Sequence, residues 1–454
     1  MSVSVFDMVS TQHSWSTEEL RNIYSEQSRY KKYLDFEAAL AQIQAELGLI
    51  PSEAAQEIVL KCKLEHIDID QIASEIRRIK HPLVPFLRQV QSKCEGGAGE
   101  WLHYGVTTQD VIDTAAVLQL KDAHEVFMRD LKELGRELSR LAATHSDTPM
   151  VGRTHGVHAL PITFGHKCAI WLDEMRRHYE RFEACGRRAL TGMVAGAVGS
   201  QASMGALGKQ VEDKVLSRLG LASPDISWAP SRDRFAEYAA NIAMLGSTIS
   251  KIGNELFNMQ RNEISEVEEM FSEGKVGSST MPHKRNPIIS ENLAGLSRTL
   301  RANAMLMMEA MVQEGERDGV AWKVEWKAFP ECCLILGVML QQAIVLLSTL
   351  KVNKTVMMEN MNRLQGYLLS ERVMLELGSR VGKQTAHEWV YEASMSGLER
   401  GVDFEKAILD HEELRNVLTL QEVGQLTDPR TYLGLCCEAV DRVIESQKEL
   451  GWLS

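Results

Sequence analysis

The prolines of this 454-residue chain leave long stretches that can form uninterrupted helix. None of its 11 prolines falls in residues 86–148, 162–223 or 331–428. A proline inside a helix removes a backbone hydrogen bond and clashes with the preceding turn, so this distribution favours long helices. The same stretches are rich in Ala, Leu, Glu and Met, which have high helix propensity. Alternating β-branched runs are scarce, so we predict an almost all-α fold.

Apolar residues in two of these stretches recur at intervals of three, four and seven residues. This spacing places them on one face of a helix and predicts a seam packed against near-parallel helices of a bundle. We expect a first helical domain over residues 1–110, a central long-helix bundle over 111–355 and a smaller helical domain over 356–454. The first series is Leu120, Phe127, Leu131, Leu134, Leu138 and Leu141, and the second is Ile242, Leu245, Ile249, Ile252, Leu256 and Met259.

Composition and charge restrict the class of protein. The formal net charge is −12 and no basic run occurs, so a nucleic-acid partner is not expected. The eight cysteines show no CxxC and no Cys/His zinc spacing, which indicates reduced thiols in a reducing compartment. The longest apolar run, residues 333–350, is interrupted by Gln341 and Gln342 and predicts a core helix rather than a membrane span. The first residues lack the order of a signal peptide, so we expect a cytoplasmic protein.

The densest group of polar side chains is GSSTMPHKRNP, residues 277–287. Two serines, a threonine, a histidine, a lysine, an arginine and an asparagine stand within eleven positions, and the following residues read as a helix entry. Donors that end at a helix N-terminus suit a bound anion. We therefore predict a functional loop here.

Three further stretches concentrate polar groups: KHPLVPF at 80–86, HYGVTTQDVIDTA at 103–115 and GRTHGVHALPITFG at 152–165. In the second, hydroxyls that follow a glycine and precede a helix suit a carboxylate. In the third, His155 and His158 have no acidic or cysteine partner at ligand spacing, which favours acid/base chemistry over a metal. The candidate side chains are Lys80, His81, His103, Thr107, Thr108, Gln109, Asp110 and His155.

These groups together suggest one kind of reaction. A proton next to a carboxylate is removed, and a group departs from the next carbon. The developing charge spreads onto the carboxylate oxygens, so fixed donors, a base and an acid are needed. A loop serine could serve as the base if amides and Lys284 stabilise its alkoxide, and Glu291, seven residues later, could orient an imidazole.

GSSTMPHKRNP resembles the signature loop of the fumarase/aspartase superfamily, and the stretches at 103–115 and 152–165 resemble two further regions of it. The likeness runs in order across most of the chain. It implies an all-α homotetramer whose long central helices form one shared bundle. Each active site would draw residues from three subunits. No metal or organic cofactor is expected, and the partner molecule would be a small substrate containing a dicarboxylate.

The resemblance also assigns roles residue by residue. Ser278 matches the catalytic base, His155 the general acid of the adenylosuccinate lyases, Glu291 its charge partner, and His81 a second histidine near the leaving group. The substrate-binding candidates are Thr107, Thr108, Gln109, Ser279, Lys284, Asn286 and Arg232.

Within the superfamily the chain combines two branches. THGVHALPITFG and Lys80–His81 resemble adenylosuccinate lyases, whereas RDGVAWKVEWKAFPE at 317–331 resembles the 3-carboxy-cis,cis-muconate cycloisomerases. Trp326 stands where an adenylosuccinate lyase has a phosphate-binding arginine, and tryptophan cannot supply a cation. We therefore predict a lyase that releases fumarate by C–N cleavage of an N-substituted aspartate or succinyl compound. A lactonising cycloisomerase and a non-catalytic binding or structural protein remain alternatives.

Overall fold

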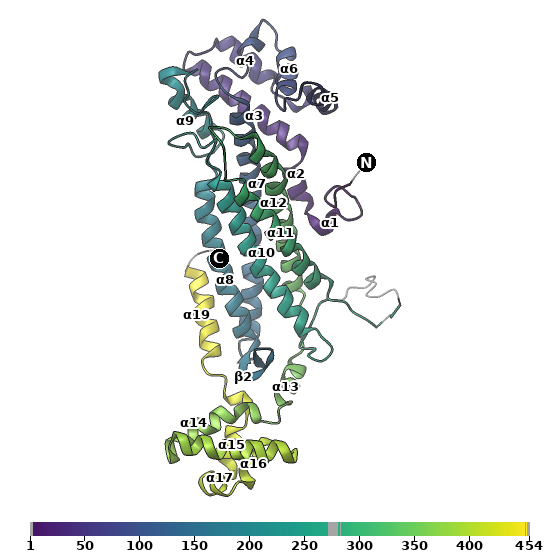
Figure 1. Cartoon of the computed structure of the whole chain (residues 1–454), viewed down its shortest axis with the longest axis vertical. Coiled ribbons are helices and arrows are strands. Elements are labelled where there is room, and N and C mark those ends of the chain that lie inside the picture. Colours follow the sequence, from purple (N-terminus) through teal and green to yellow (C-terminus); the bar gives the residue numbers. More distant parts are fainter. Residues whose placement is uncertain (1–2, 271–279, 282, 450, 452–454) are drawn as a thin grey trace. The chain divides into compact units, whose positions relative to one another are not determined.

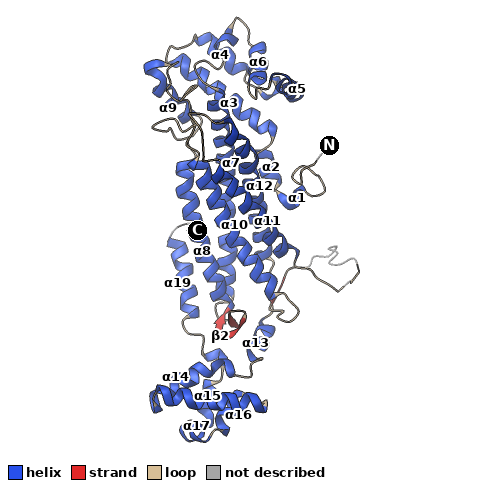
Figure 2. Ribbon diagram, in the orientation of Figure 1, coloured by secondary structure: helices blue, strands red, loops and turns tan. Residues whose placement is uncertain are grey.

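The computed structural model describes residues 3–270, 280–281, 283–449 and 451. Helix dominates these residues, and the strands among them form only two two-stranded sheets (Figure 2). The predicted all-α fold class is confirmed. Contacts between Cα atoms divide the chain into two compact units. Unit 1 comprises Met1–Leu131, His178–Ser250 and Ala294–Gln341, and unit 2 comprises Lys132–Arg177, Lys251–Leu293 and Gln342–Ser454.

Five long helices, labelled in Figure 1, have residues in both units by their position in the sequence. They are α7 (Thr108–Thr144), α8 (Phe164–Ala189), α10 (Asp233–Met259), α11 (Ile288–Glu309) and α12 (Gly319–Ser348). All twelve residues of the two predicted seams, which lie on α7 and α10, are at most 3% exposed, so their predicted burial is confirmed. By length and composition α12 alone among the described helices could span a membrane, but 67% of its most apolar stretch is buried inside the protein.

Unit 1 holds the shorter helices of the N-terminal part. They are α1 (Gln12–Trp15), α2 (Glu18–Ile23), α3 (Glu26–Glu46), α4 (Ser52–Lys61), α5 (Ile69–Ile79), α6 (Val84–Lys93) and α9 (Gly208–Arg218), with the 3-10 turns η1 (Leu64–His66), η2 (Ala98–Trp101) and η3 (Gly205–Leu207).

A chain of aromatic side chains ties four long helices together within unit 1. Phe127 of α7 contacts Phe182 of α8 edge to face, with ring centroids 6.3 Å apart. Phe182 contacts Tyr238 of α10 at 5.5 Å, and Tyr238 contacts Phe329 of α12 at 6.2 Å. Such edge-to-face pairs add to the free energy gained by burying the rings, and they fix the long helices that carry parts of the site.

Unit 2 combines two antiparallel two-stranded sheets with short helices. The elements are β1 (Pro149–Thr154), β2 (Val157–Thr163), β3 (Val267–Glu268), β4 (Lys351–Val352), α13 (Lys354–Asn362), α14 (Ser370–Val381), α15 (Lys383–Arg400), α16 (Phe404–Asp410), α17 (Glu412–Val417), α18 (Leu420–Leu426) and α19 (Cys436–Glu449), with the 3-10 turns η4 (Tyr367–Leu369) and η5 (Pro429–Thr431). Helices α14 to α18 enclose their own apolar cluster, which includes Val373, Leu377, Val390, Phe404 and Leu414.

Candidate active site

In unit 2, His155 lies at the tip of the antiparallel hairpin formed by β1 and β2. Thr154 pairs with Val157, so His155 and Gly156 form a two-residue turn. Their φ angles are +51° and +81°. Two positive φ values define the hairpin turn whose twist matches that of the flanking strands, and glycine meets this demand without strain. The turn leaves the His155 side chain exposed to solvent.

Buried groups anchor the base of this hairpin. Arg153 donates two hydrogen bonds to the Glu266 carboxylate, at 2.9 and 2.6 Å, and Asn360 Nδ2 donates to the same carboxylate at 2.9 Å. The Glu266 side chain is fully buried, so these charge-assisted bonds form away from water. Val151 of β1 packs in one apolar cluster with Met361. The turn that carries His155 therefore rises from a fixed support.

Ser278 and Ser279 lie outside the described residues. Of the same loop, Lys284 and Asn286 line a cavity of about 1250 Å³ in unit 2, together with Glu291 of α11. Lys284 and Glu291 are exposed. This arrangement leaves the ammonium group of Lys284 accessible to a negatively charged substrate.

The N-terminus of α11, which the sequence suggests as an anion-binding place, is filled by the chain's own carboxylate. Glu269 accepts hydrogen bonds from the backbone N–H groups of Ile289 at 3.1 Å and Ser290 at 2.9 Å. It also accepts from the Ser290 hydroxyl at 2.6 Å. The expectation of free amide donors at this helix end is therefore corrected: a bound substrate must use other donors, or displace Glu269.

The predicted pairing of Glu291 with His155 does not occur within one chain. Both residues belong to the described part of unit 2, and no hydrogen bond or ion pair joins their side chains there. Their pairing stays a prediction that involves a second copy of the chain.

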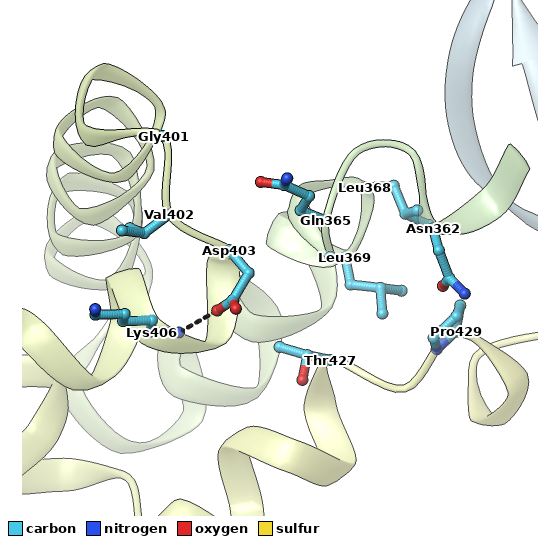
Figure 3. A pocket seen from close by; sticks show the side chains of 11 residues that line it. Asn362, Gln365, Leu368, Leu369, Gly401, Val402, Asp403, Lys406, Thr427 and Pro429 are labelled. Atoms are coloured by element: carbon cyan, nitrogen blue, oxygen red, sulfur yellow. Dashed lines mark hydrogen bonds between the residues drawn. The ribbon is translucent and has the colours of Figure 1, made fainter. Parts of the chain in front are cut away.

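A second cavity of unit 2 holds none of the predicted site residues. It has a volume of about 550 Å³ and lies beside α16, where the Asp403 carboxylate caps the helix by accepting from Lys406 N–H at 2.8 Å (Figure 3). Gln365, Thr427 and Asn362 also face this space. Nothing among these groups resembles the predicted acid and base.

In unit 1, His81 caps the start of α6. Its Nδ1 accepts hydrogen bonds from the backbone N–H groups of Leu83, at 3.3 Å, and Val84, at 3.1 Å. Burial, with the nearby His103 and Arg317, lowers the pKa of His81. A neutral ring whose Nδ1 accepts must carry its proton on Nε2. His81 is thus prepared to donate a hydrogen bond from Nε2.

His103 forms a charged pair with a carboxylate far away in sequence. Its Nδ1 lies 2.6 Å from Oε1 of Glu37 on α3, whose side chain is fully buried. Burial alone would disfavour the imidazolium, but the Glu37 carboxylate outweighs this effect and raises the pKa of His103. Nothing in the local pattern around His103 points to Glu37, so sequence reasoning missed this pair.

The first turn of α7 is held by a buried aspartate. Asp110 accepts from the N–H groups of Thr107, Ala195 and Gly196, each at 2.9 Å. Burial raises the pKa of Asp110 to about 6, although these three donors oppose the shift. Thr107 also receives a hydrogen bond from Arg317 to its hydroxyl, at 2.8 Å. Arg317 is a cation of the site that the sequence analysis did not single out.

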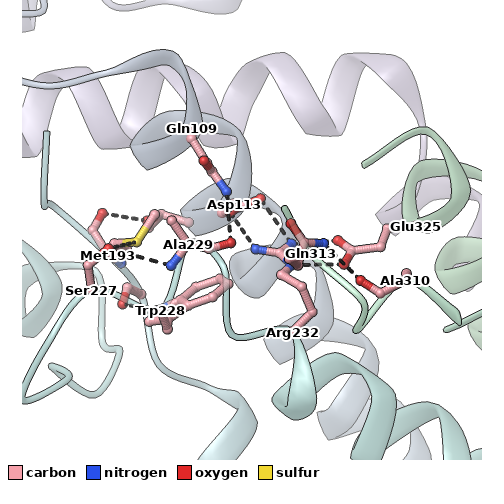
Figure 4. Close-up of polar contacts among 12 residues, drawn as sticks. Gln109, Asp113, Met193, Ser227, Trp228, Ala229, Arg232, Ala310, Gln313 and Glu325 are labelled. Carbon is pink, nitrogen blue, oxygen red and sulfur yellow. Dashed lines mark hydrogen bonds and ion pairs between the residues drawn. The ribbon is translucent and has the colours of Figure 1, made fainter. Parts of the chain in front are cut away.

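Two predicted substrate-binding residues are instead part of a buried polar network (Figure 4). Gln109 is 2% exposed and its amide donates to Asp113, at 3.0 Å, and to the Ala229 carbonyl, at 3.2 Å. Arg232 is also 2% exposed and donates to Asp113 at 2.7 Å and to Glu325 at 2.8 Å. Both side chains already use their hydrogen-bond donors within the protein. We therefore assign them a structural role, in which they hold the neighbouring elements of the site in place.

The predicted residues are thus divided between the units. Unit 1 brings His81 and Thr107 together with His103 and Arg317, and Thr108 begins α7 beside them. Unit 2 carries the remaining described candidates, which are His155, Lys284, Asn286 and Glu291.

Comparison with known proteins identifies the family. The model of the family described as Lyase matches residues 12–301. The model of the family described as Adenylosuccinate lyase C-terminus matches residues 366–443. N-acetyl-S-(2-succino)cysteine lyase of Dickeya dadantii is 45% identical over 454 residues, which cover 100% of both chains. Adenylosuccinate lyase of Methanocaldococcus jannaschii is 39% identical, over 96% of this chain and 95% of its own.

A solved structure agrees with these sequence matches. The 3-carboxy-cis,cis-muconate lactonizing enzyme of Pseudomonas putida superposes with a TM-score of 0.91 and 31% identity, covering 96% of this chain and 98% of its own. The chain therefore belongs to the fumarate lyase superfamily, in the branch of the adenylosuccinate lyases and carboxymuconate cycloisomerases, and is a fumarate-releasing lyase.

Proposed function

We propose that this lyase removes a thiol from an S-(2-succinyl) thioether and releases fumarate. The observation that carries the proposal is the 45% identity to an N-acetyl-S-(2-succino)cysteine lyase over the full length of both chains. Trp326 supports it, because a nucleotide phosphate would need a cation at that position. C–N cleavage of an N-substituted aspartate is the second candidate, favoured by the match of residues 366–443 to the adenylosuccinate lyase C-terminus.

The proposed reaction assigns a role to each candidate group. Ser278 takes the proton from the carbon next to one carboxylate, and Lys284 with Asn286 stabilises the charge that develops there. The C–S bond on the neighbouring carbon then breaks, a C=C bond forms, and the sulfur leaves with the bonding electrons. His155 supplies a proton to the departing group, and His81, as an Nε2–H donor, assists near it.

The identity of the leaving group makes a chemical difference at His155. A thiol has a pKa near 8.5, so a thiolate can depart with little help from an acid. A departing nitrogen is far more basic and must be protonated as the bond breaks. Loss of the His155 imidazole should therefore slow C–N cleavage more than C–S cleavage.

A substrate panel tests the proposal directly. Purified protein is incubated with N-acetyl-S-(2-succino)cysteine, adenylosuccinate and 3-carboxymuconate, while fumarate absorbance and free thiol are followed. We expect fumarate and thiol in equal amounts from the thioether. Ser278→Ala should nearly abolish turnover, whereas Ser272→Ala, a matched change just upstream of the loop, should not. Fumarate from adenylosuccinate alone would select C–N cleavage, and lactone from the muconate would select cycloisomerisation.

We also propose that the enzyme is a homotetramer with shared active sites. Several large apolar residues of unit 1 stay exposed on long helices, among them Met244 of α10 at 43% and Met305 of α11 at 57%. Apolar side chains gathered on helix faces are typical of protein interfaces. The exposed position of His155 supports a site that other copies complete.

A further inference from the structure

Unit 1 contains a mostly apolar cavity of about 270 Å³ that the sequence analysis did not predict. One face of α3 lines it at spacings of three and four residues, and α7 and α12 contribute similar faces. The lining residues used below are Glu26, Arg29, Tyr30, Pro82, Ile112, Asp113, Arg232, Glu325, Trp326 and Phe329. A small apolar cavity with a few polar groups is the usual form of a ligand subsite.

The cavity adjoins the groups expected to meet the leaving group. Pro82, which lines it, follows His81 directly in the chain. Ile112, which also lines it, lies one helical turn after Thr108, where α7 begins. A substituent attached to a succinyl group held near His81 and Thr107 would thus have space to enter here.

Three of the five charged residues around the cavity neutralise one another only in part. Arg232 is sandwiched between Asp113, at 2.7 Å, and Glu325, and all three are almost fully buried. Two carboxylates and one guanidinium leave an excess of one negative charge in a low-dielectric wall. The other two charged lining residues, the exposed Glu26 and the half-buried Arg29, are opposite in sign, so the balance around the cavity stays at one negative charge. That excess disfavours a phosphate dianion about twice as strongly as a singly charged carboxylate.

Arg29 differs from Arg232 because its charge is available. It lies half-buried in the first turn of α3, and no carboxylate of the described residues forms an ion pair with it. A guanidinium matches a carboxylate in shape and can bind it through two parallel hydrogen bonds. Arg29 is therefore suited to hold a single carboxylate that enters the cavity.

Aromatic rings form the rest of the wall near Arg29. Tyr30 is 5% exposed and Phe329 is 5% exposed. Trp326, 40% exposed, stacks on Trp322 with ring centroids 5.5 Å apart. These surfaces suit methylene and acyl groups, and they supply no second cation for a phosphate.

We propose that this cavity binds the leaving group, with Arg29 holding a carboxylate on it and Tyr30, Trp326 and Phe329 enclosing its uncharged part. This inference rests on the proposed elimination, and it restricts the range of compounds that the enzyme would accept as substrates. The substrate class is a succinylated amino-acid derivative whose amino-acid carboxylate is free, and nucleotides are excluded.

Two substrates that differ in one carboxylate test Arg29. The first is N-acetyl-S-(2-succino)cysteine, and the second is S-(2-succino)-N-acetylcysteamine, whose leaving group lacks the carboxylate. We expect Arg29→Gln to lower kcat/KM for the first by about 10- to 100-fold, the range for a lost charge-assisted hydrogen bond, mostly through KM. The second should change by less than about threefold. Arg77→Gln, an exposed arginine of α5 outside the cavity, is the matched control.

The possible outcomes separate this inference from the proposed elimination. If the wild type turns over both substrates and Arg29→Gln affects them equally or not at all, the subsite is wrong while the elimination stands. If the wild type releases fumarate from neither, the elimination fails. Calorimetric binding of N-acetylcysteine then decides the subsite: binding that Arg29→Gln abolishes supports it, and absent or unchanged binding overturns it.

Discussion

At the scale of single residues, the backbone conformation of His155 and the acid function of its side chain can be tested separately. Its φ of +51° is uncommon for any residue other than glycine, although asparagine, aspartate and histidine adopt such angles more often than the rest. Asparagine followed by glycine is the preferred pair for such a turn. We therefore expect His155→Asn to keep or slightly raise the melting temperature, because the hairpin is preserved.

The same substitution removes the proposed acid. We expect turnover of an N-substituted succinate to fall by about 10²- to 10⁴-fold, and turnover of a thioether to fall less. Thermal unfolding and fumarate release, measured on the same preparation, check both parts. His155→Val is the contrast, because a β-branched residue resists a positive φ and should also lower the melting temperature. Full activity of His155→Asn on both substrates would remove His155 from the mechanism.

The His103–Glu37 pair makes stability depend on pH. The pKa of His103 is higher in the folded state than the unfolded value of about 6.5. The pair therefore contributes its full stabilisation of the folded state below about pH 6.5. The stabilisation is lost as pH rises through the folded-state pKa of His103. We expect Glu37→Gln to cost about 2 kcal/mol of unfolding free energy at pH 6, and less as pH rises. Denaturant unfolding of both proteins from about pH 6 to about pH 9 measures this, and a constant difference would contradict it.

At the scale of elements, α11 depends on a cap supplied by the segment before the loop. Glu269→Ala removes the acceptor for Ile289 and Ser290 and should cost about 1 kcal/mol. We expect faster hydrogen exchange at these two amides, measured by mass spectrometry or NMR. Glu263→Ala, an exposed residue that lines the same cavity, should leave that exchange unchanged. Equal protection in Glu269→Ala would mean that other acceptors hold this helix end.

Local pattern predicted the helices well and the hairpin poorly. Periodic apolar spacing marks Leu131 and Ile249 as buried, because a long helix repeats its signal many times. Strands β1 and β2 are short, and Val151 becomes buried only by packing with α13 and η4. The Gly-rich turn at His155 and Gly156 was the readable sign of a hairpin, but no strands were predicted on either side of it.

Charged pairs were the least predictable part of the site. Arg232 looks like a free cation in sequence, but Asp113 and Glu325, 119 and 93 residues away, already neutralise it. Glu37 is 66 residues from His103. A single sequence does not show which residues so far apart along the chain will pair. A contiguous motif, in contrast, can be recognised from its own residues.

At the scale of the whole molecule, shared active sites can be tested by mixing variants. If Ser278 and His155 of one site come from different chains, Ser278→Ala and His155→Asn in pure form each impair every site, and an N-substituted succinate, whose cleavage depends most on His155, is the substrate to use. Co-expressed, they should form some sites with both residues intact and regain part of the activity. Simple mixing of folded proteins, which does not exchange chains, is the control. No recovery from co-expression would place both residues of a site in one chain.

The exposed apolar surface of α11 gives a second test of assembly. The double change Met305→Glu and Met308→Glu should split the oligomer, because charges would be buried at the interface. Light scattering after size exclusion measures the mass. Ile226→Glu, in a loop and 78% exposed, is the control that should leave the mass unchanged. An unchanged mass of the double variant would place the interface elsewhere.

The two-residue turn at the hairpin tip also limits how this enzyme can evolve. Few residues tolerate the backbone of position 155, and apart from histidine those that do, glycine, asparagine and aspartate, have no proton to donate near neutral pH. Lineages that drift away from histidine therefore pass first through well-folded but slow variants. Such a route preserves the folded protein while its catalytic activity falls, so the fold stays available for selection on another property.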